Sequence, residues 1–218
     1  MNYDNIANYI DHSVLVPQST TADVIRACED AKKYGFKAIC VNSGNVATVT
    51  EHLKGSDVIV CSTVGFPLGA VSTDVKVYET KEAIANGATE IDMVINVGRL
   101  KDKNYEYVET DIAEIAKACQ AGHAKLKVIM ETCLLNDEEK VKVCELAVAA
   151  GADFVKTSTG FSSGGATEHD VQLLRKTVGE GIGVKASALI TTYEIGVAML
   201  KAGANRLGSK DGTIVMKK

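Results

Sequence analysis

The chain has 218 residues, 46% of them hydrophobic and 24% charged, so it can bury a sizeable core and has the composition of a globular protein. Its net charge of −4 argues against a nucleic-acid-binding surface. No apolar run approaches the length of a membrane span, and the first residues do not resemble a secretion signal. We therefore expect a cytoplasmic protein without nucleic-acid or membrane partners.

Short β-rich segments recur along the chain, separated by helix-like stretches that end in glycine. Glycine commonly ends a helix because it adopts the left-handed conformation at little cost. In chain order, strands are predicted near residues 9–15, 37–41, 58–64, 90–96, 125–130, 153–156, 183–186 and 205–208. Alternating strands and helices favour a parallel sheet with right-handed crossovers, and eight repeats close into a barrel. The sequence thus predicts a single (β/α)8 TIM barrel over residues 1–218.

An open, doubly wound sheet is the alternative α/β architecture. It normally carries a glycine-rich phosphate loop after an early strand, whereas the glycine-rich segment 160–165 follows the sixth predicted strand. The predicted helices have one apolar face, clearest in the segment 108–119. Its apolar residues are Val108, Ile112, Ile115, Ala116 and Cys119, and its charged residues are Glu109, Asp111, Glu114 and Lys117. We expect the first set to pack on the sheet and the second to face solvent.

Two lysines stand at the ends of apolar strands, Lys156 on the sixth and Lys185 on the seventh. In such barrels the reactive groups gather at the carboxyl ends of the strands. Each ammonium disfavours protonation of the other, and an uncharged amine can attack a carbonyl group. Asp92 lies within the apolar fourth strand and needs a cationic neighbour. We expect these three catalytic residues to converge, although a purely structural ion pair remains an alternative.

The proposed chemistry requires no metal and no cofactor, because a protonated imine withdraws electrons as a metal ion would. The six cysteines show no metal-binding spacing, and we interpret them as reduced thiols, mostly in the core. Cys40 closes the second strand, where core packing is a better explanation than substrate contact.

Several long motifs resemble the deoxyribose-phosphate aldolase family, and the similarity spans almost the whole chain. They are EIDMVINVG at 90–98, ETCLL at 131–135, FVKTSTGF at 154–161 and VKAS at 184–187. The resemblance implies a class I aldolase in which Lys156 forms the Schiff base while Lys185 and Asp92 manage protons. It implies reversible cleavage of 2-deoxyribose 5-phosphate to acetaldehyde and glyceraldehyde 3-phosphate, and a possible homodimer. A catalytically silent metabolite-binding barrel, or less favourably a phosphosugar isomerase, is the alternative.

Two loops depart from the family pattern. Ala188 and Leu189 stand where the family has two glycines, and Lys210 and Asp211 stand where it has two serines. Both loops follow the last two strands, where barrels of this kind commonly bind phosphate. A leucine side chain and a carboxylate there predict a shift toward unphosphorylated acceptor aldehydes. The alternative is that Ser209, Lys210 and the surrounding amides rebuild a working phosphate site. The candidate substrate-binding residues are Thr157, Ser187, Gly208 and Ser209.

Overall fold

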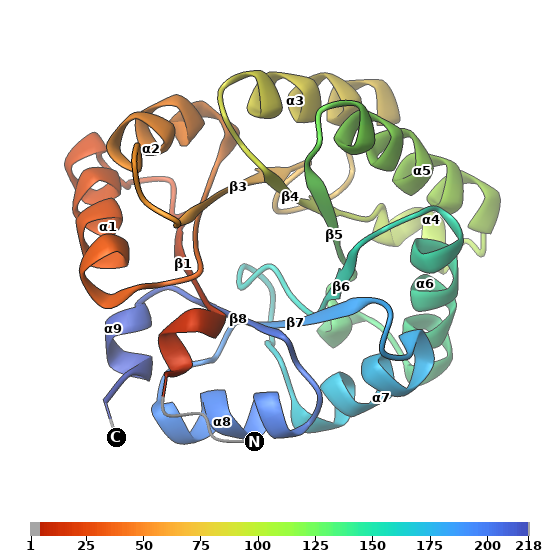
Figure 1. The fold of residues 1–218 in the computed structure, drawn as a ribbon. Helices are drawn as coiled ribbons and strands as arrows, with labels where there is room; N and C mark the ends of the chain where they lie inside the picture. Colours follow the sequence, from red (N-terminus) through yellow and green to blue (C-terminus); the bar gives the residue numbers. More distant parts are fainter. Residues whose placement is uncertain (1–4, 218) are drawn as a thin grey trace.

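The computed structural model describes residues 5–217, which form a closed barrel of eight parallel strands surrounded by helices (Figure 1). The strands follow one another around the barrel in chain order, and β8 pairs with β1. Their bounds are β1 Ile10–Val14, β2 Ala38–Val41, β3 Ile59–Val64, β4 Glu90–Val94, β5 Lys125–Ile129, β6 Phe154–Lys156, β7 Gly183–Ser187 and β8 Arg206–Ser209. The predicted TIM barrel is confirmed, and each strand ends within two residues of its expected bounds. The expected single domain over 1–218 stays a prediction, since residues 1–4 and 218 lie outside the described part.

The helices lie outside the barrel, as Figure 1 shows. They are α1 Thr21–Tyr34, α2 Val46–His52, α3 Thr73–Ala85, α4 Val97–Lys101, α5 Tyr105–Ala121, α6 Asp137–Ala149, α7 Glu168–Val178, α8 Tyr193–Lys201 and α9 Gly212–Val215, with short 3-10 turns at Ile6–Tyr9, Ser43–Asn45 and Thr132–Leu134. Helix α1 illustrates how particular residues determine where a helix begins and ends. Thr20 and Asp23 form a capping box at its start, and Gly35, with φ of 71°, ends it in the left-handed conformation.

The register of the strands determines which side chains meet inside the barrel. Residues that are paired in neighbouring parallel strands point to the same face of the sheet. Asp92 on β4 is paired with Lys127 on β5, and Lys185 on β7 is paired with both Lys156 and Arg206. These charged side chains therefore share the interior, while alternating apolar residues pack against the helices.

One expectation about the helices was wrong. Helix α5 buries its apolar face as predicted, but Asp111 is also buried instead of facing solvent. The neighbouring helix α3 supplies a partner, because Lys76 Nζ lies 2.5 Å from Asp111 Oδ2. A buried carboxylate is tolerated where a cation and further hydrogen bonds compensate it, and Thr73 donates one such bond at 2.8 Å.

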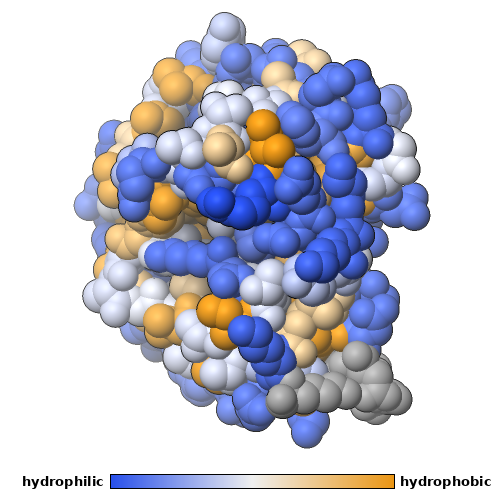
Figure 2. Space-filling view, turned by 90° about the vertical axis from the view of Figure 1, so that its left-hand side faces the viewer, coloured by the Kyte–Doolittle hydropathy of each residue, from blue (hydrophilic) through white to orange (hydrophobic). Residues whose placement is uncertain are grey.

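One face of the outer surface, the face that Figure 2 shows, is mostly polar. Figure 2 shows the side of the molecule that carries α1, α2 and α9 in Figure 1; hydrophilic residues cover most of this face, and hydrophobic ones are scattered over it. Within residues 5–217, no helix combines the length and hydrophobicity needed to cross a membrane.

Candidate active site

The two predicted lysines and the predicted aspartate meet inside the barrel. Lys156 Nζ lies 2.7 Å from Asp92 Oδ2, and Lys185 Nζ lies 2.8 Å from the same oxygen. All three side chains are almost completely buried. Since both amines contact one carboxylate oxygen, they are close neighbours, and the convergence expected from the sequence is present.

Four further charged residues lie beside these three and were not assigned a role from the sequence: Asp11, Glu90, Lys127 and Arg206. Lys127 Nζ lies 2.7 Å from Asp92 Oδ1 and 2.6 Å from Glu90 Oε2. The signal for Lys127 was present in the segment KLKVI at 125–129, where alternation places every second residue on the interior face. A lysine in mid-strand of a buried sheet has to be matched by interior carboxylates.

The seven charges form a closed pattern. Lys185 Nζ lies 2.5 Å from Asp11 Oδ2, Arg206 Nε donates to Asp11 Oδ1 at 2.8 Å, and Arg206 also donates two hydrogen bonds of 2.9 Å to Glu90. Following these contacts gives a ring of six alternating charges, which we call the charge ring. Its members in order are Asp92, Lys185, Asp11, Arg206, Glu90 and Lys127. Among residues 5–217, the ring member that contacts Lys156 in an ion pair is Asp92.

The ring fixes the charge state of its members. Burial opposes ionisation of Asp92, but Lys127, Lys156 and Lys185 outweigh it and hold its pKa well below the ordinary value. Burial likewise disfavours the charged form of Lys185, yet the carboxylates of Asp11 and Asp92 raise its pKa above the usual range. Before any substrate reacts, Lys185 is therefore an ammonium group beside Lys156.

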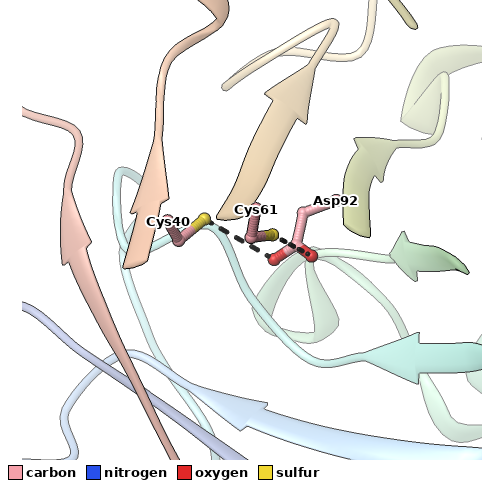
Figure 3. A group of neighbouring side chains, drawn as sticks. All are labelled: Cys40, Cys61 and Asp92. Carbon is pink, nitrogen blue, oxygen red and sulfur yellow. Dashed lines mark hydrogen bonds between the residues drawn. The ribbon is translucent and has the colours of Figure 1, made fainter. Parts of the chain in front are cut away.

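Two thiols reach the same carboxylate from the opposite side. Figure 3 shows Cys40 on β2 and Cys61 on β3 pointing toward Asp92, with Cys61 Sγ 3.1 Å from Oδ1 and Cys40 Sγ 3.9 Å from Oδ2. Burial raises the pKa of Cys61 well above its ordinary value, so this thiol remains a hydrogen-bond donor. The expectation that Cys40 packs in the core agrees with its burial against Ala38 and Cys61.

These thiols and Asp92 are close enough together to be considered as metal ligands, since their ligand atoms all lie within 4.8 Å of one another. The surrounding charges disfavour a metal ion, because the ammonium groups of Lys127 and Lys185 already neutralise Asp92 and would repel a cation. The donor set therefore supports a proton-handling site and not a metal centre.

A cavity of about 720 Å³ opens above this cluster at the carboxyl ends of the strands. Lys156 lies in its lining, whereas the fully buried Lys127 and Lys185 do not. The walls include Leu15, Phe161 and Ile190, which give the cavity an apolar side. A small carbonyl compound in this cavity would meet the Lys156 amine first.

The candidate substrate-binding residues fall into two groups. Ser187, Gly208 and Ser209 line the cavity, and Ser187 Oγ has no hydrogen-bond partner within the described residues. Thr157 is fully buried outside the lining; its hydroxyl accepts from Ser187 N at 3.1 Å and donates to Ser187 O at 3.3 Å. Thr157 thus holds β7 against β6 and positions Ser187.

The two unusual loops form one rim of the cavity. Ala188 and Leu189 have φ of 68° and 62°, the left-handed region that glycine adopts most easily, and Leu189 is 64% exposed. Asp211 Oδ1 accepts from the backbone N–H and the hydroxyl of Thr213, at 2.9 and 2.6 Å. Lys210 Nζ lies 5.6 Å from the centre of the Phe161 ring.

A parallel barrel with paired lysines and a carboxylate at the base of its cavity has the arrangement of an imine-forming aldolase. Comparison with known proteins agrees with this class. Residues 5–205 match the DeoC/LacD family of aldolases, and the chain belongs to this family.

Its relatives include two deoxyribose-phosphate aldolases of nearly the same length. The one from Thermococcus kodakarensis is 55% identical over 100% of this chain and 98% of its own, and that from Bacillus cytotoxicus is 56% identical over 97% and 95%. Among solved structures, the tetrameric deoxyribose phosphate aldolase from Aeropyrum pernix has a TM-score of 0.92 at 30% identity, covering 99% of this chain and 91% of its own. An aldolase called QR15 has a TM-score of 0.92 at 37% identity, covering 97% and 94%.

Proposed function

We propose that this chain is a class I aldolase that cleaves 2-deoxyribose 5-phosphate reversibly to acetaldehyde and glyceraldehyde 3-phosphate, with Lys156 as the imine-forming nucleophile. One observation carries the assignment of Lys156. It is the one lysine of the described charge cluster that both contacts Asp92 and lines the cavity. Lys127 and Lys185 each bridge two carboxylates and do not line the cavity.

The geometry supports a specific division of roles. The Lys156 amine attacks the carbonyl carbon of the sugar in its open form and gives a carbinolamine. The Lys185 ammonium, which shares Asp92 Oδ2 with Lys156, supplies the proton on which the hydroxyl leaves as water. Asp92 orients both nitrogens and passes the proton between them. As the carbon–carbon bond breaks, its electron pair moves into the iminium, and the neighbouring sugar hydroxyl gives its proton back to the Lys185 amine, so glyceraldehyde 3-phosphate leaves as an aldehyde. The acetaldehyde unit remains as an enamine on Lys156. Protonation of the enamine carbon and addition of water then release acetaldehyde and restore the Lys156 amine.

Borohydride trapping tests this assignment. Reduction in the presence of acetaldehyde should leave a stable two-carbon adduct, located on Lys156 by peptide mass spectrometry. The K156R variant should give no adduct and no turnover, while K81R, which changes an exposed lysine of α3, should behave as the wild type. An adduct elsewhere, or turnover by K156R, would refute the role of Lys156. Absence of any adduct on the wild type would favour the silent metabolite-binding barrel.

We further propose that acceptor preference has moved toward unphosphorylated aldehydes. The support comes from the cavity rim, where Leu189 places an apolar side chain and Asp211 a negative charge. Phosphate sites need backbone N–H groups that approach the oxygens closely, and side chains in a left-handed loop restrict that approach. A dianionic group near Asp211 would also be repelled, by about 4 kcal/mol for unit charges 4 Å apart at an effective dielectric of about 20. Lys210 offsets part of this repulsion.

Steady-state kinetics separate the two substrate classes. We expect kcat/KM for free 2-deoxyribose to exceed that for its 5-phosphate, and the double variant A188G/L189G to recover activity on the phosphate through a lower KM. A matched control is L68G, which removes an exposed leucine from a loop outside the cavity lining. Equal or higher kcat/KM for the phosphate in the wild type would overturn the proposed shift while leaving the aldolase assignment intact.

We also propose self-association as a homodimer. Large apolar side chains are exposed together on the β3–α3 connection and the first turns of α3: Leu68, Val71, Val75 and Tyr78. Exposed apolar surface of this kind favours a protein contact. Light scattering after size exclusion should give twice the monomer mass for the wild type and a monomer for Y78E; a monomeric wild type would refute the dimer.

A further inference from the structure

We propose that Arg206 is a positioning residue for the aldol reaction. It completes the charge ring, so that the six charges of the ring cancel. A neutral ring disfavours a positive charge on Lys156, the seventh group of the cluster, and so keeps its amine uncharged. This inference rests on the proposed function of Lys156. It concerns a residue that lies at the start of β8, is paired with Lys185 of β7, and does not line the main cavity.

Arg206 is held in the barrel by Asp11, Glu90 and Phe154, and its Nη2 also donates to Asp11 Oδ1. Its Nε donates to Asp11 Oδ1 at 2.8 Å, its two terminal nitrogens donate to the two carboxylate oxygens of Glu90 at 2.9 Å, and its guanidinium carbon lies 6.0 Å from the centre of the Phe154 ring. The residue is 5% exposed. A guanidinium group stays protonated in proteins, so Arg206 contributes a positive charge that does not change with pH.

The charge balance explains why that contribution matters for Lys156. In the charge ring every carboxylate contacts two ring cations, and every cation contacts two carboxylates. The three negative and three positive charges cancel. Every ring carboxylate is already balanced by ring cations. Protonation of Lys156 would therefore add a fourth positive charge to a buried site without a further negative charge to balance it, which is unfavourable. Without the charge of Arg206 the ring would be negative, and protonation of Lys156 would restore neutrality.

Other titratable groups lie around the ring. Burial raises the pKa of Cys61 on β3, whose Sγ lies 3.1 Å from Asp92 Oδ1. A hydrogen bond from Cys61 lowers the pKa of Cys40 on β2, whose Sγ lies 3.9 Å from Asp92 Oδ2. His12 on β1 accepts a hydrogen bond from Gly212 N at 3.2 Å, and burial lowers the pKa of His12. Glu131, which follows β5, accepts a hydrogen bond from Thr159 N at 3.1 Å and another from the Thr159 hydroxyl. Among the described residues, Lys156 forms its ion pair with Asp92 and none with these four.

The test is the pH dependence of kcat/KM in four variants. In R206M, the acid limb, which reports loss of the uncharged amine, should move upward by about one pH unit, the low end of the effect of a neighbouring charge. In R206K the positive charge is kept, so the limb should remain near the wild-type position. In E90Q a negative charge is removed, so the limb should move downward. In E90Q/R206M the ring is neutral again, and the limb should return.

Folding and the proposed function are checked separately. Circular dichroism and thermal unfolding identify variants that fail to fold, and E90Q, which keeps the side-chain shape, still tests the sign of the effect if R206M does not fold. Borohydride trapping on the alkaline plateau should label Lys156 in every folded variant. Unmoved acid limbs in R206M and E90Q, with Lys156 still labelled, would overturn the role of Arg206. Loss of labelling in the wild type would instead refute the proposed function.

Discussion

The buried pair between α3 and α5 should dominate the stability of the outer helical layer on that side. Lys76 and Asp111 are both at most 1% exposed, their charged atoms are 2.5 Å apart, and Lys76 also donates to Val94 O at 2.9 Å. Removing one partner leaves a buried charge uncompensated, which costs about 3–5 kcal/mol. We therefore expect D111A to lose about that much free energy of unfolding. K76M/D111L, which replaces both charges with apolar groups, should lose far less.

Urea denaturation at pH 7 measures this effect, with E114A as the matched control. Glu114 pairs with Lys117 on the same helix, but these side chains are 43% and 69% exposed, and such pairs contribute about 1 kcal/mol or less. Burial already lowers the pKa of Lys76 despite the opposing effect of Asp111. In D111A this pKa should fall further, so the variant should regain stability as the pH rises through it. A loss in D111A no larger than that in E114A would refute the reasoning.

Three further perturbations have defined outcomes. In G208A the added Cβ would lie 2.0 Å from Ser187 Oγ and 3.3 Å from Lys185 Cε, so kcat/KM should fall at least about tenfold. The control G44A, whose Cβ would meet nothing within 4 Å, should keep the wild-type kcat/KM. Equal activity of the two variants would contradict this expectation. Burial opposes ionisation of Asp11, but Lys185, Arg206 and Lys127 lower its pKa from 3.8 to about 2. Its ionised form therefore stabilises the fold above pH 3.8, and that stabilisation is lost as the pH falls toward 2. D11N should be less stable than the wild type at pH 7. In acid titrations followed by circular dichroism, D11N should lose less stability than the wild type between pH 3.8 and 2. N136A removes the capping box of α6 and should cost about 1 kcal/mol in urea denaturation without changing kcat/KM, so a loss of activity in the folded variant would be unexpected.

The barrel could be predicted from the sequence because the patterns that indicate its strands and helices are local and repeated. Each strand is a short apolar run bounded by a helix end, and eight such units leave few topologies. Asp111 shows what local patterns miss. Its position on the charged side of α5 predicts exposure, and only the packing of α3 against α5 reveals that Lys76 is available to neutralise it.

For the same reason, only part of the buried charge cluster could be predicted from the sequence. Lys156, Lys185 and Asp92 stand out as charges at the ends of apolar runs or inside them. Arg206 opens its strand and Glu90 does the same, so each is indistinguishable by sequence from a solvated residue at a strand boundary. Their contact depends on closing the barrel, which brings β8 and β4 to opposite sides of one interior. Such a long-range pairing has no local sequence pattern.

The residues proposed for chemistry and those proposed for substrate recognition lie in different parts of the fold. The charge ring depends on residues within β1, β4, β5, β7 and β8, whose positions are fixed by strand pairing and by contacts across the barrel. Leu189 and Asp211 belong to loops beyond the ends of β7 and β8, and neither contributes to the ring. We therefore expect substitutions in these loops to alter substrate preference without disturbing the charge ring. This separation lets the chain keep the proposed catalytic residues Lys156, Lys185 and Asp92 while Leu189 and Asp211 change the rim of the cavity.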